Sequence, residues 1–384
     1  MKKTITEGKA TIIVNTKDIA TKNQEVFYNP KMEMNRTLSI LLLKAIKKKG
    51  QHMLLPLAGT GIRGIRFLLE LPKTMIAGIQ LNDVNPRAVE YMNKNLGANK
   101  LEKELRVKIT NEDANALLAR TESGFDYIDI DPFGSPNFLL DNAIRRLKGK
   151  AILAVTATDT APLAGTYPIT CKAKYWATSS NVPAKHELGL RILIRKVQLM
   201  GMHHEKALIP ILSYNHEHYY RIYFLCERGR RKAAKLYEDL IGMYSYCANC
   251  GHFIINENKI KQCPICNERK MKYTGHLYTG PVQDVALLKA IKKLNTKKIG
   301  ASKDLAIDKL LTGLLTETEI ESVGHYDFHD LASKHRVSIQ KYEEYDKQLG
   351  KHKIVRVATN RYGFKTTAPA KEVHALFEKK PKKK

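Results

Sequence analysis

A carboxylate, a proline and an aromatic ring follow one another at the end of a predicted strand. Residues Phe125–Asp131 alternate in the way a strand does, and Pro132 and Gly134 then break the pattern. In open α/β sheets, ligands bind at this carboxyl edge. An Asp-Pro-Phe turn there suits the exocyclic amine of a nucleobase. The Asp131 carboxylate and the Pro132 carbonyl accept its two N–H bonds, and Phe133 stacks on the base. The competing interpretation is an ordinary loop start.

A glycine-rich turn follows an earlier apolar segment. Met53–Ala58 has the composition of a buried strand and leads into Gly59, Gly61 and Gly64, after which a helical pattern begins. Glycines at this spacing let a strand turn sharply into a helix whose N-terminus faces a ligand. The pattern alone does not separate NAD from S-adenosylmethionine. Asp83 ends the next predicted strand, 19 positions after Gly64, where a carboxylate binds ribose hydroxyls.

Two further residues complete a nucleoside site. Asp113 and Ala114 follow the third predicted strand, in a position to contact an adenine amine. A single Asp at a strand end is usually an N-cap or turn residue, but carboxylates at successive strand ends indicate one shared site. The order of elements is that of a doubly wound, Rossmann-like S-adenosylmethionine-dependent methyltransferase sheet. The strands are predicted at 53–58, 75–81, 105–110, 125–131, 151–156, 207–212 and 220–225.

Four cysteines form two close pairs in the C-terminal half. Two residues separate Cys247 from Cys250 and Cys263 from Cys266, and twelve residues lie between the pairs. Two such pairs supply four thiolates for a tetrahedral Zn²⁺ and leave no open coordination position, which predicts a structural zinc ribbon. Redox-active cysteine pairs are the alternative, but the chain shows no thioredoxin pattern.

The chain is strongly basic. Its 384 residues contain 65 Lys and Arg against 38 Asp and Glu, a formal net charge of +27. This charge favours a nucleic acid as the partner. A lysine-rich thermophile surface is the alternative, although such surfaces usually balance Lys with Glu. The sequence shows no apolar stretch as long as a membrane span and no signal peptide at its N-terminus. We therefore expect a cytoplasmic protein without membrane contact or an obligate protein partner.

The length allows two domains. We place the methyltransferase domain with an N-terminal arm at residues 1–235, and a smaller α+β C-terminal domain with the zinc ribbon at 236–384. The boundary falls at a connecting helix predicted over Leu236–Ile241. Helices followed by a basic hairpin indicate a winged-helix-like RNA-binding element, and the tail Lys379–Lys384 adds non-specific affinity. The helices are predicted over 282–293, 303–315 and 327–334, and the hairpin over 354–358 and 364–367.

Several segments together resemble a known family over nearly the whole chain. The most specific are the Asp-Pro-Phe-Gly turn and Phe27–Pro30. On these residues the chain resembles the tRNA guanine-26 N2-dimethyltransferases, and the archaeal members most closely. The other segments are Glu7–Ala10, Met32–Arg36, Gly61–Arg66, Asn82–Pro86, Asp113–Ala114, the four cysteines and Gly275–Gly280.

The resemblance implies an activity and a site. The activity is the transfer of one or two methyl groups from S-adenosylmethionine to N2 of guanine 26 in tRNA, giving N2,N2-dimethylguanosine. Asp131 and Phe133 are expected at the target base, with Asp131 as acceptor of the N2 proton. A guanidinium group suits the methionine carboxylate of the cofactor. The residues expected around the cofactor are Arg36, Arg63, Asp83, Asp113 and Ala114.

One departure and three alternatives stay open. Many relatives carry an acidic residue at the end of the first strand, but Met53–Leu57 has none. Asp129 or backbone carbonyls remain as candidates to hold the methionine ammonium group. The turn also fits an amino-methyltransferase acting on guanine 10 or 27 of tRNA, or on adenine in DNA or rRNA. A non-catalytic RNA-binding protein with this fold, or a nicotinamide enzyme, is a more distant alternative.

Overall fold

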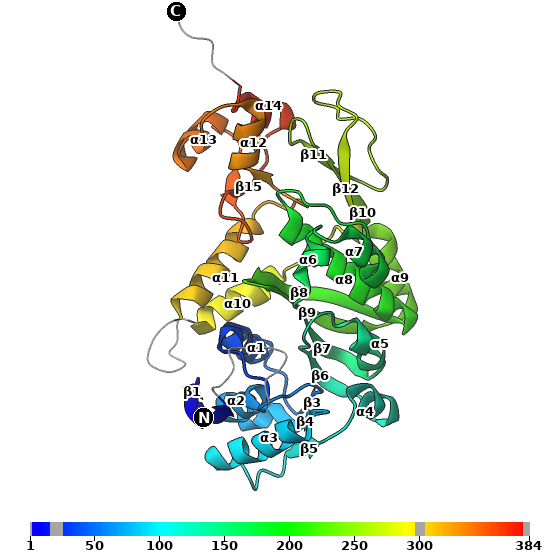
Figure 1. The fold of residues 1–384 in the computed structure, drawn as a ribbon, viewed down its shortest axis with the longest axis vertical. Coiled ribbons are helices and arrows are strands. Elements are labelled where there is room, and N and C mark those ends of the chain that lie inside the picture. The colour runs from blue at the N-terminus through cyan, green and yellow to red at the C-terminus, as the bar shows by residue number, and fades with distance from the viewer. Residues whose placement is uncertain (1, 16–25, 296–303, 379–384) are drawn as a thin grey trace, which may run out of the picture.

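A seven-stranded, mostly parallel sheet forms the centre of the molecule (Figure 1). The computed structural model describes residues 2–15, 26–295 and 304–378. In this sheet β9 runs antiparallel to both of its neighbours, and the other described pairs are parallel. The doubly wound prediction is confirmed. In spatial order the strands are β5 (Val107–Thr110), β4 (Ile76–Asn82), β3 (Gln51–Leu55), β6 (Phe125–Ile130), β7 (Leu147–Ala157), β9 (Tyr219–Arg228) and β8 (Lys206–His216).

Helices cover both faces of the sheet, which explains why its central strands are apolar along most of their length. Residues 151–157 of β7 are all buried. Against one face pack β1 (Lys2–Glu7), β2 (Ala10–Asn15), α1 (Glu33–Ile46), α2 (Ile62–Glu70), α3 (Pro86–Ala98), α10 (Val285–Asn295) and α11 (Leu305–Glu317). Against the other pack α4 (Ala114–Arg120), α5 (Asn137–Arg145), α6 (Thr160–Leu163), α7 (Pro168–Tyr175) and α8 (Lys185–His203).

A second, three-stranded sheet carries the cysteine segment. It consists of β11 (Phe253–Asn256), β10 (Ile241–Cys247) and β12 (Met271–Tyr278), in that order. The connecting helix predicted over Leu236–Ile241 is wrong in its bounds, because α9 spans Arg230–Asp239 and Ile241 already starts β10. The β10 residues find their partners in β12, about thirty residues later, a pairing that a local helical pattern does not reveal. The domain boundary near residue 235 stays a prediction.

The last third contains a third small sheet with helices around it. The predicted helix near 327–334 and the predicted hairpin are confirmed, since α12 follows an Asp327 N-cap and β14 pairs antiparallel with β15. Helix α11 precedes these elements in the chain. The resulting order of one helix, one strand, two helices and two strands is that of a winged helix. The elements are β13 (Tyr326–Asp327), α12 (Phe328–His335), α13 (Tyr342–Leu349), β14 (Ile354–Arg356), β15 (Gly363–Thr366) and α14 (Ala370–Ala375).

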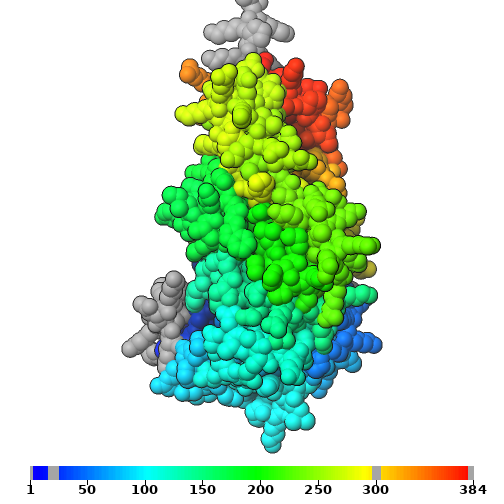
Figure 2. Space-filling view, turned by 90° about the vertical axis from the view of Figure 1, so that its right-hand side faces the viewer, coloured from blue at the N-terminus to red at the C-terminus, as the bar shows by residue number. Residues whose placement is uncertain are grey.

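The molecule is elongated. Figure 2 shows the cyan residues around α3 and α4 at one end, and the yellow-green cysteine segment beside the red C-terminal helices at the other. Among the described residues, no helix has both the length and the apolar character to cross a membrane. The predicted start of a helix at Lys303 and the basic tail lie outside the described residues.

Candidate active site

Four neighbouring parallel strands bring the predicted ligand residues to one edge of the sheet. The glycine turn follows β3, Asp83 follows β4, Asp113 follows β5 and Asp131 follows β6. Carboxyl ends of parallel strands meet at a common edge, where open α/β sheets bind ligands. The sequence-based grouping of these residues therefore matches their position in the fold.

The glycine turn needs its glycines. Gly59 and Gly61 have φ values of +55° and +79°, which side chains rarely adopt, and Gly61 forms the N-cap of α2. A Cβ on Gly59 would stand 3.0 Å from the Phe27 carbonyl oxygen. The Asp83 carboxylate accepts hydrogen bonds from the backbone N–H of Gly59 (2.8 Å) and of Asn85 (3.0 Å). Asp83 thus connects the end of β4 to the glycine turn by hydrogen bonds.

Asp113 and Ala114 begin a helix at the same edge. Asp113 is the N-cap of α4, and its Oδ1 accepts from the backbone N–H of Asn115 and Ala116, both at 2.9 Å. This is the N-cap role that isolated Asp residues usually have. Both bonds use Oδ1, so Oδ2 can accept a hydrogen bond from a ligand. Ala114 is buried as the first residue of the helix.

Asp129 lies inside the sheet, fixed by basic and hydroxyl groups. Arg221 donates to both of its oxygens, at 2.9 and 2.7 Å, and the Tyr127 hydroxyl donates to Oδ2 at 2.5 Å. Arg63 Nη1 lies 3.5 Å from Oδ2. Burial alone would raise the pKa of Asp129, but Arg221 and Arg63 outweigh it and hold that pKa below its ordinary value. Asp129 is therefore ionised, and each of its oxygens accepts at least one hydrogen bond.

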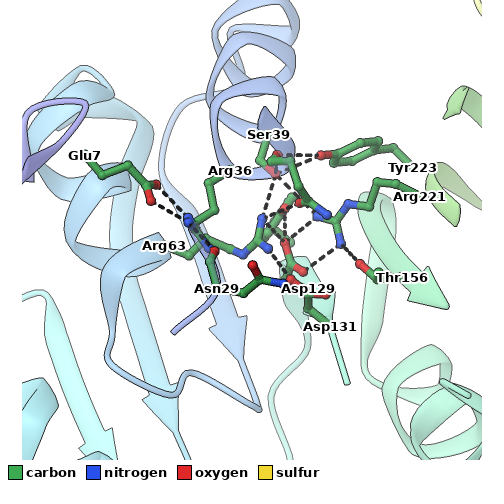
Figure 3. Close-up of polar contacts among 12 residues, drawn as sticks. Glu7, Asn29, Arg36, Ser39, Arg63, Asp129, Asp131, Thr156, Arg221 and Tyr223 are labelled. Carbon is green, nitrogen blue, oxygen red and sulfur yellow. Dashed lines mark hydrogen bonds and ion pairs between the residues drawn. The ribbon is translucent and has the colours of Figure 1, made fainter. Parts of the chain in front are cut away.

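Arg63 joins this buried pair to the predicted catalytic carboxylate. Its Nη2 donates to Asp131 Oδ2, and its Nη1 donates to Asn35 Oδ1 (2.9 Å) and Ser39 Oγ (3.0 Å) of α1. Figure 3 shows the Arg63 guanidinium between Asp129 and Asp131. Asp131 remains partly open to solvent, with 20% of its side chain exposed, whereas the Asp129 side chain is 1% exposed. The structure thus brings Arg63, which was expected at the cofactor, to Asp131.

The N-terminal hairpin reaches the site through Glu7. This buried carboxylate accepts from Arg36 Nε at 2.6 Å and from Arg36 Nη2, and Arg66 Nη1 donates to it at 2.9 Å. Burial would raise the pKa of Glu7, but Arg36 and Arg66 hold that pKa below its ordinary value. Arg36 Nη2 also donates to the Asn29 carbonyl at 3.1 Å. Arg36 is therefore held in a fixed orientation at the wall of the cavity.

A small cavity of about 50 Å³ opens between these groups. Phe27 forms part of its wall and meets the exposed ring of Phe133 edge-on, with ring centres 4.2 Å apart. Thr60 Oγ1 lines it, buried and without a hydrogen-bond partner among the described residues. A buried hydroxyl without a partner fits a polar ligand. The lining residues are Phe27, Tyr28, Asn29, Arg36, Leu55, Leu57, Ala58, Gly59, Thr60, Ile62, Arg63, Asp129 and Asp131.

The predicted residues do not all reach this cavity. Arg36, Gly59, Arg63 and Asp131 line it. The remaining predicted residues stand at the neighbouring turns and strand ends rather than on its wall: Gly61, Asp83, Asp113, Ala114, Pro132 and Phe133.

Two buried charged residues at the site were given no role by the sequence interpretation. Glu7 begins the Glu7–Ala10 segment of the family resemblance, but that segment did not indicate a place at the site. Arg221 had a signal, because a charged residue interrupts the apolar strand pattern of 220–225. A buried charge requires a partner, and the structure shows that this partner is Asp129. Asp129 lines the cavity and its Oδ1 accepts from Arg221, so Asp129 and backbone carbonyls both remain candidates for the methionine ammonium group.

The four predicted metal ligands form one cluster. Their sulfur atoms all lie within 4.8 Å of one another, with 3.5 Å between Cys247 and Cys266 and 3.7 Å between Cys250 and Cys263. A tetrahedral zinc site with Zn–S bonds of about 2.3 Å places its sulfurs about 3.8 Å apart. Burial raises the pKa of the Cys247 thiol, and hydrogen bonds from the backbone N–H groups of Asn249 and Cys250 offset part of this rise. The residues present therefore fit Zn²⁺.

The strand order, with one antiparallel strand next to the last, and a nucleoside-type site at the carboxyl edge define the class of Rossmann-like methyltransferases. The sequence comparison narrows this class. Residues 8–378 match the family described as N2,N2-dimethylguanosine tRNA methyltransferase. The chain belongs to this family.

Individual relatives cover most of the chain. The tRNA (guanine(26)-N(2)/guanine(27)-N(2))-dimethyltransferase of Aquifex aeolicus is 36% identical over 88% of this chain and 86% of its own. The tRNA (guanine(26)-N(2))-dimethyltransferase of Saccharolobus solfataricus is 37% identical over 82% of this chain and 80% of its own. The structure of Trm1 from Pyrococcus horikoshii in complex with S-adenosyl-L-methionine superposes with a TM-score of 0.84 at 30% identity, covering 98% of this chain and 100% of that one.

Proposed function

We propose that this enzyme transfers methyl groups from S-adenosylmethionine to N2 of guanine 26 in tRNA, producing N2,N2-dimethylguanosine. The observation that carries the proposal is the Asp131-Pro132-Phe133 turn at the cavity, in a chain that belongs to this family. The net charge of +27 suits a polyanionic substrate. The enzyme would act in the cytoplasm without an obligate protein partner, and methyl transfer by the purified chain tests that independence.

The cofactor would lie across the glycine turn. Its ribose hydroxyls would contact Asp83, its adenine amine the free oxygen of Asp113, and its methionine carboxylate Arg36. The orphaned hydroxyl of Thr60 is a further donor to the methionine part. Bound there, S-adenosylmethionine supplies a methyl group already activated by the sulfonium charge.

The chain's own residues would then prepare the guanine. Asp131 and the Pro132 carbonyl accept both N2–H bonds, which turns the N2 lone pair toward the methyl donor. Asp131 accepts the proton released on transfer, a role typically worth about 10²–10⁴-fold in rate. Arg63 holds the Asp131 carboxylate in position, so little reorganisation is needed during the reaction. Phe133 stacks on the flipped base and offsets part of the cost of unstacking it.

The test is transfer of labelled methyl groups to unmodified tRNA transcripts, followed by nucleoside analysis. We expect N2,N2-dimethylguanosine with a G26 transcript and none with A26. A transcript with A26 and G27 examines the second position named for the Aquifex relative. Equal labelling of the G26 and A26 transcripts would contradict the proposal and move the target to another nucleotide.

A further inference from the structure

Large apolar side chains are exposed around the Asp-Pro-Phe-Gly turn and α7. Ile169 is 86% exposed, and the others are about half exposed. Exposed apolar residues that gather in one place mark interaction sites more often than scattered ones do. The members of this group are Phe133, Phe138, Tyr167, Ile169 and Trp176.

The outward face of α7 is unusual for a surface helix. Four exposed residues recur on this face at the helical spacings of three and four: Ile169, Lys172, Ala173 and Trp176. Cys171 lies on the opposite side and is buried. An outward helix face is ordinarily polar, whereas this one combines apolar groups with lysines. The helix Pro168–Tyr175 contains two lysines and no acidic residue.

Trp176 is held in place by two basic residues of α8. Lys196 Nζ lies 2.9 Å from the centre of its ring, and Arg195 donates to its backbone carbonyl at 3.1 Å. The residue is nevertheless 54% exposed. A fixed aromatic ring with an exposed surface loses little conformational entropy when a second ring stacks on it.

This face is attached directly to the turn that carries Phe133. Asn137 Nδ2 donates to the Lys174 carbonyl at 2.7 Å, and the buried Tyr175 hydroxyl lies 3.0 Å from Ser135 Oγ. Tyr175 also donates to Asp159 at 2.6 Å. A ligand bound on α7 therefore has a fixed position relative to the residues that would receive the target base.

We propose that the outward face of α7, with Phe133 and Phe138, binds unstacked tRNA nucleotides that flank the target guanine. The inference rests on the proposed function and names the surface that the tRNA uses. A guanine that leaves its stack to reach Asp131 loses its contacts with its neighbours. Proteins that hold such unpaired nucleotides combine aromatic stacking with basic side chains along the backbone. Tyr167 and Trp176 supply the first. Lys172 on this face supplies the second, together with Lys174 beside it, whose ammonium group also pairs with Asp159.

The test is the affinity of the full-length chain for unmodified tRNA, measured without S-adenosylmethionine. Tyr167→Ala and Trp176→Ala should each weaken binding about five-fold or more, as loss of one base–aromatic stack does. Leu105→Ala is the matched control, because Leu105 is 99% exposed and far from this helix in sequence. Cofactor affinity should stay unchanged in all three. Lys172→Gln and Lys174→Gln should each reduce the slope of log Kd against log salt concentration by about one.

Two outcomes would overturn the inference. One is a tRNA affinity of both aromatic variants equal to that of Leu105→Ala. The other is loss of a concentration-dependent dimer in these variants with tRNA affinity unchanged, which would make the face an interface between two copies. The binding assay needs no catalysis, so the two proposals can fail separately. If the aromatic variants bind tRNA more weakly but the wild type makes no N2,N2-dimethylguanosine, the proposed function alone is overturned.

Discussion

Asp129 and Arg221 form a two-point ion pair inside the central sheet, with N–O distances of 2.9 and 2.7 Å. Arg63 continues this pair toward the cavity and ends at Asp131. Two carboxylates and two guanidinium groups thus alternate along one line, and their formal charges cancel. This balance keeps four charged groups together at the base of a largely apolar sheet. It also fixes the outermost member, Asp131, where a nucleobase amine would bind.

Replacing the outermost carboxylate tests its chemical role. Asp131→Asn keeps the size of the side chain but removes the proton acceptor, so we expect kcat to fall about 10²–10⁴-fold. Cofactor binding should persist, because the proposed cofactor contacts lie at other strand ends. Single-turnover methyl transfer and cofactor titration measure the two effects separately. Asp141→Asn, on the exposed side of α5, serves as control. Equal rates for both variants would remove Asp131 from the mechanism.

Removing the buried partner of Asp129 should destabilise the fold. Arg221→Met leaves Asp129 buried, with Arg63 and Tyr127 as its remaining partners among the described residues. Breaking a buried pair typically costs about 3–5 kcal/mol. Urea unfolding followed by circular dichroism measures this loss. Arg87→Met breaks the exposed pair with Glu90 and should change stability by less than about 0.5 kcal/mol. Similar losses in the two variants would mean that burial does not determine the strength of these pairs.

The Glu7 ion pairs should make stability depend on pH in the acid range. The pKa of Glu7 is lowered from its ordinary value of 4.5, since Arg36 and Arg66 outweigh the effect of burial. Its contribution is therefore fully present above about pH 4.5 and is lost as the pH falls through the lower folded-state pKa. Wild type should exceed Glu7→Gln in unfolding free energy at pH 7, and the gap should narrow below pH 4.5. Glu122→Gln, at an exposed position, should show a small gap at every pH. A constant gap for Glu7→Gln would refute this origin.

Metal content distinguishes the cysteines that bind zinc from buried cysteines that do not. The purified wild type should contain one Zn²⁺ per chain, and Cys250→Ser should lose it. Cys226→Ala, away from the cluster, should retain the metal. Lys334 donates to the Ala248 carbonyl at 2.5 Å, so loss of the metal should also loosen α12 against the cysteine segment. Amide exchange of α12 measures this, and equal exchange with and without metal would contradict it. Elemental analysis requires protein prepared without metal-affinity resin.

A methyl group on Gly64 should disturb the glycine turn through packing. A Cβ there would stand 2.4 Å from Leu81 Cδ2, so α2 or Leu81 must move. Such overpacking typically costs about 1–3 kcal/mol, and the shift of α2 should weaken cofactor binding. Gly97→Ala is the matched control, because nothing lies within 4 Å of its Cβ position in α3. Thermal unfolding of the two variants should move in opposite directions, since alanine favours a helix.

Local patterns were sufficient for the parts of the fold that local chemistry determines. The apolar strands, the glycine turn, the Asp residues at strand ends and the paired cysteines each follow from neighbours along the chain, and each lies where its pattern indicated. The C-terminal hairpin and the helix after Asp327 also followed from turn and cap residues. These features were predictable because one segment carries the whole signal.

Contacts between distant segments were not predictable in the same way. Glu7 pairs with Arg36 and Arg66, 29 and 59 residues away, and Asp129 pairs with Arg221, 92 residues away. Nothing in either segment states which partner it will meet. The β10 strand was missed for the same reason, because its pairing with β12 determines its conformation. Sequence patterns therefore identified the residues at the edge of the sheet better than the residues that hold them in place.

The packing of α10 and α11 has a consequence for any attempt to divide this enzyme. Leu288 and Ile291 of α10 and Leu311 of α11 belong to the same apolar core as Leu38 and Leu42 of α1. Helix α1 in turn carries Arg36 and Ser39, which hold the cavity groups. A fragment that stopped after the central sheet would expose this side of α1 to water. The helix that carries these cavity groups therefore packs on chain synthesised about sixty residues after the last strand of the central sheet, and we expect the cavity to form only after that chain has been made.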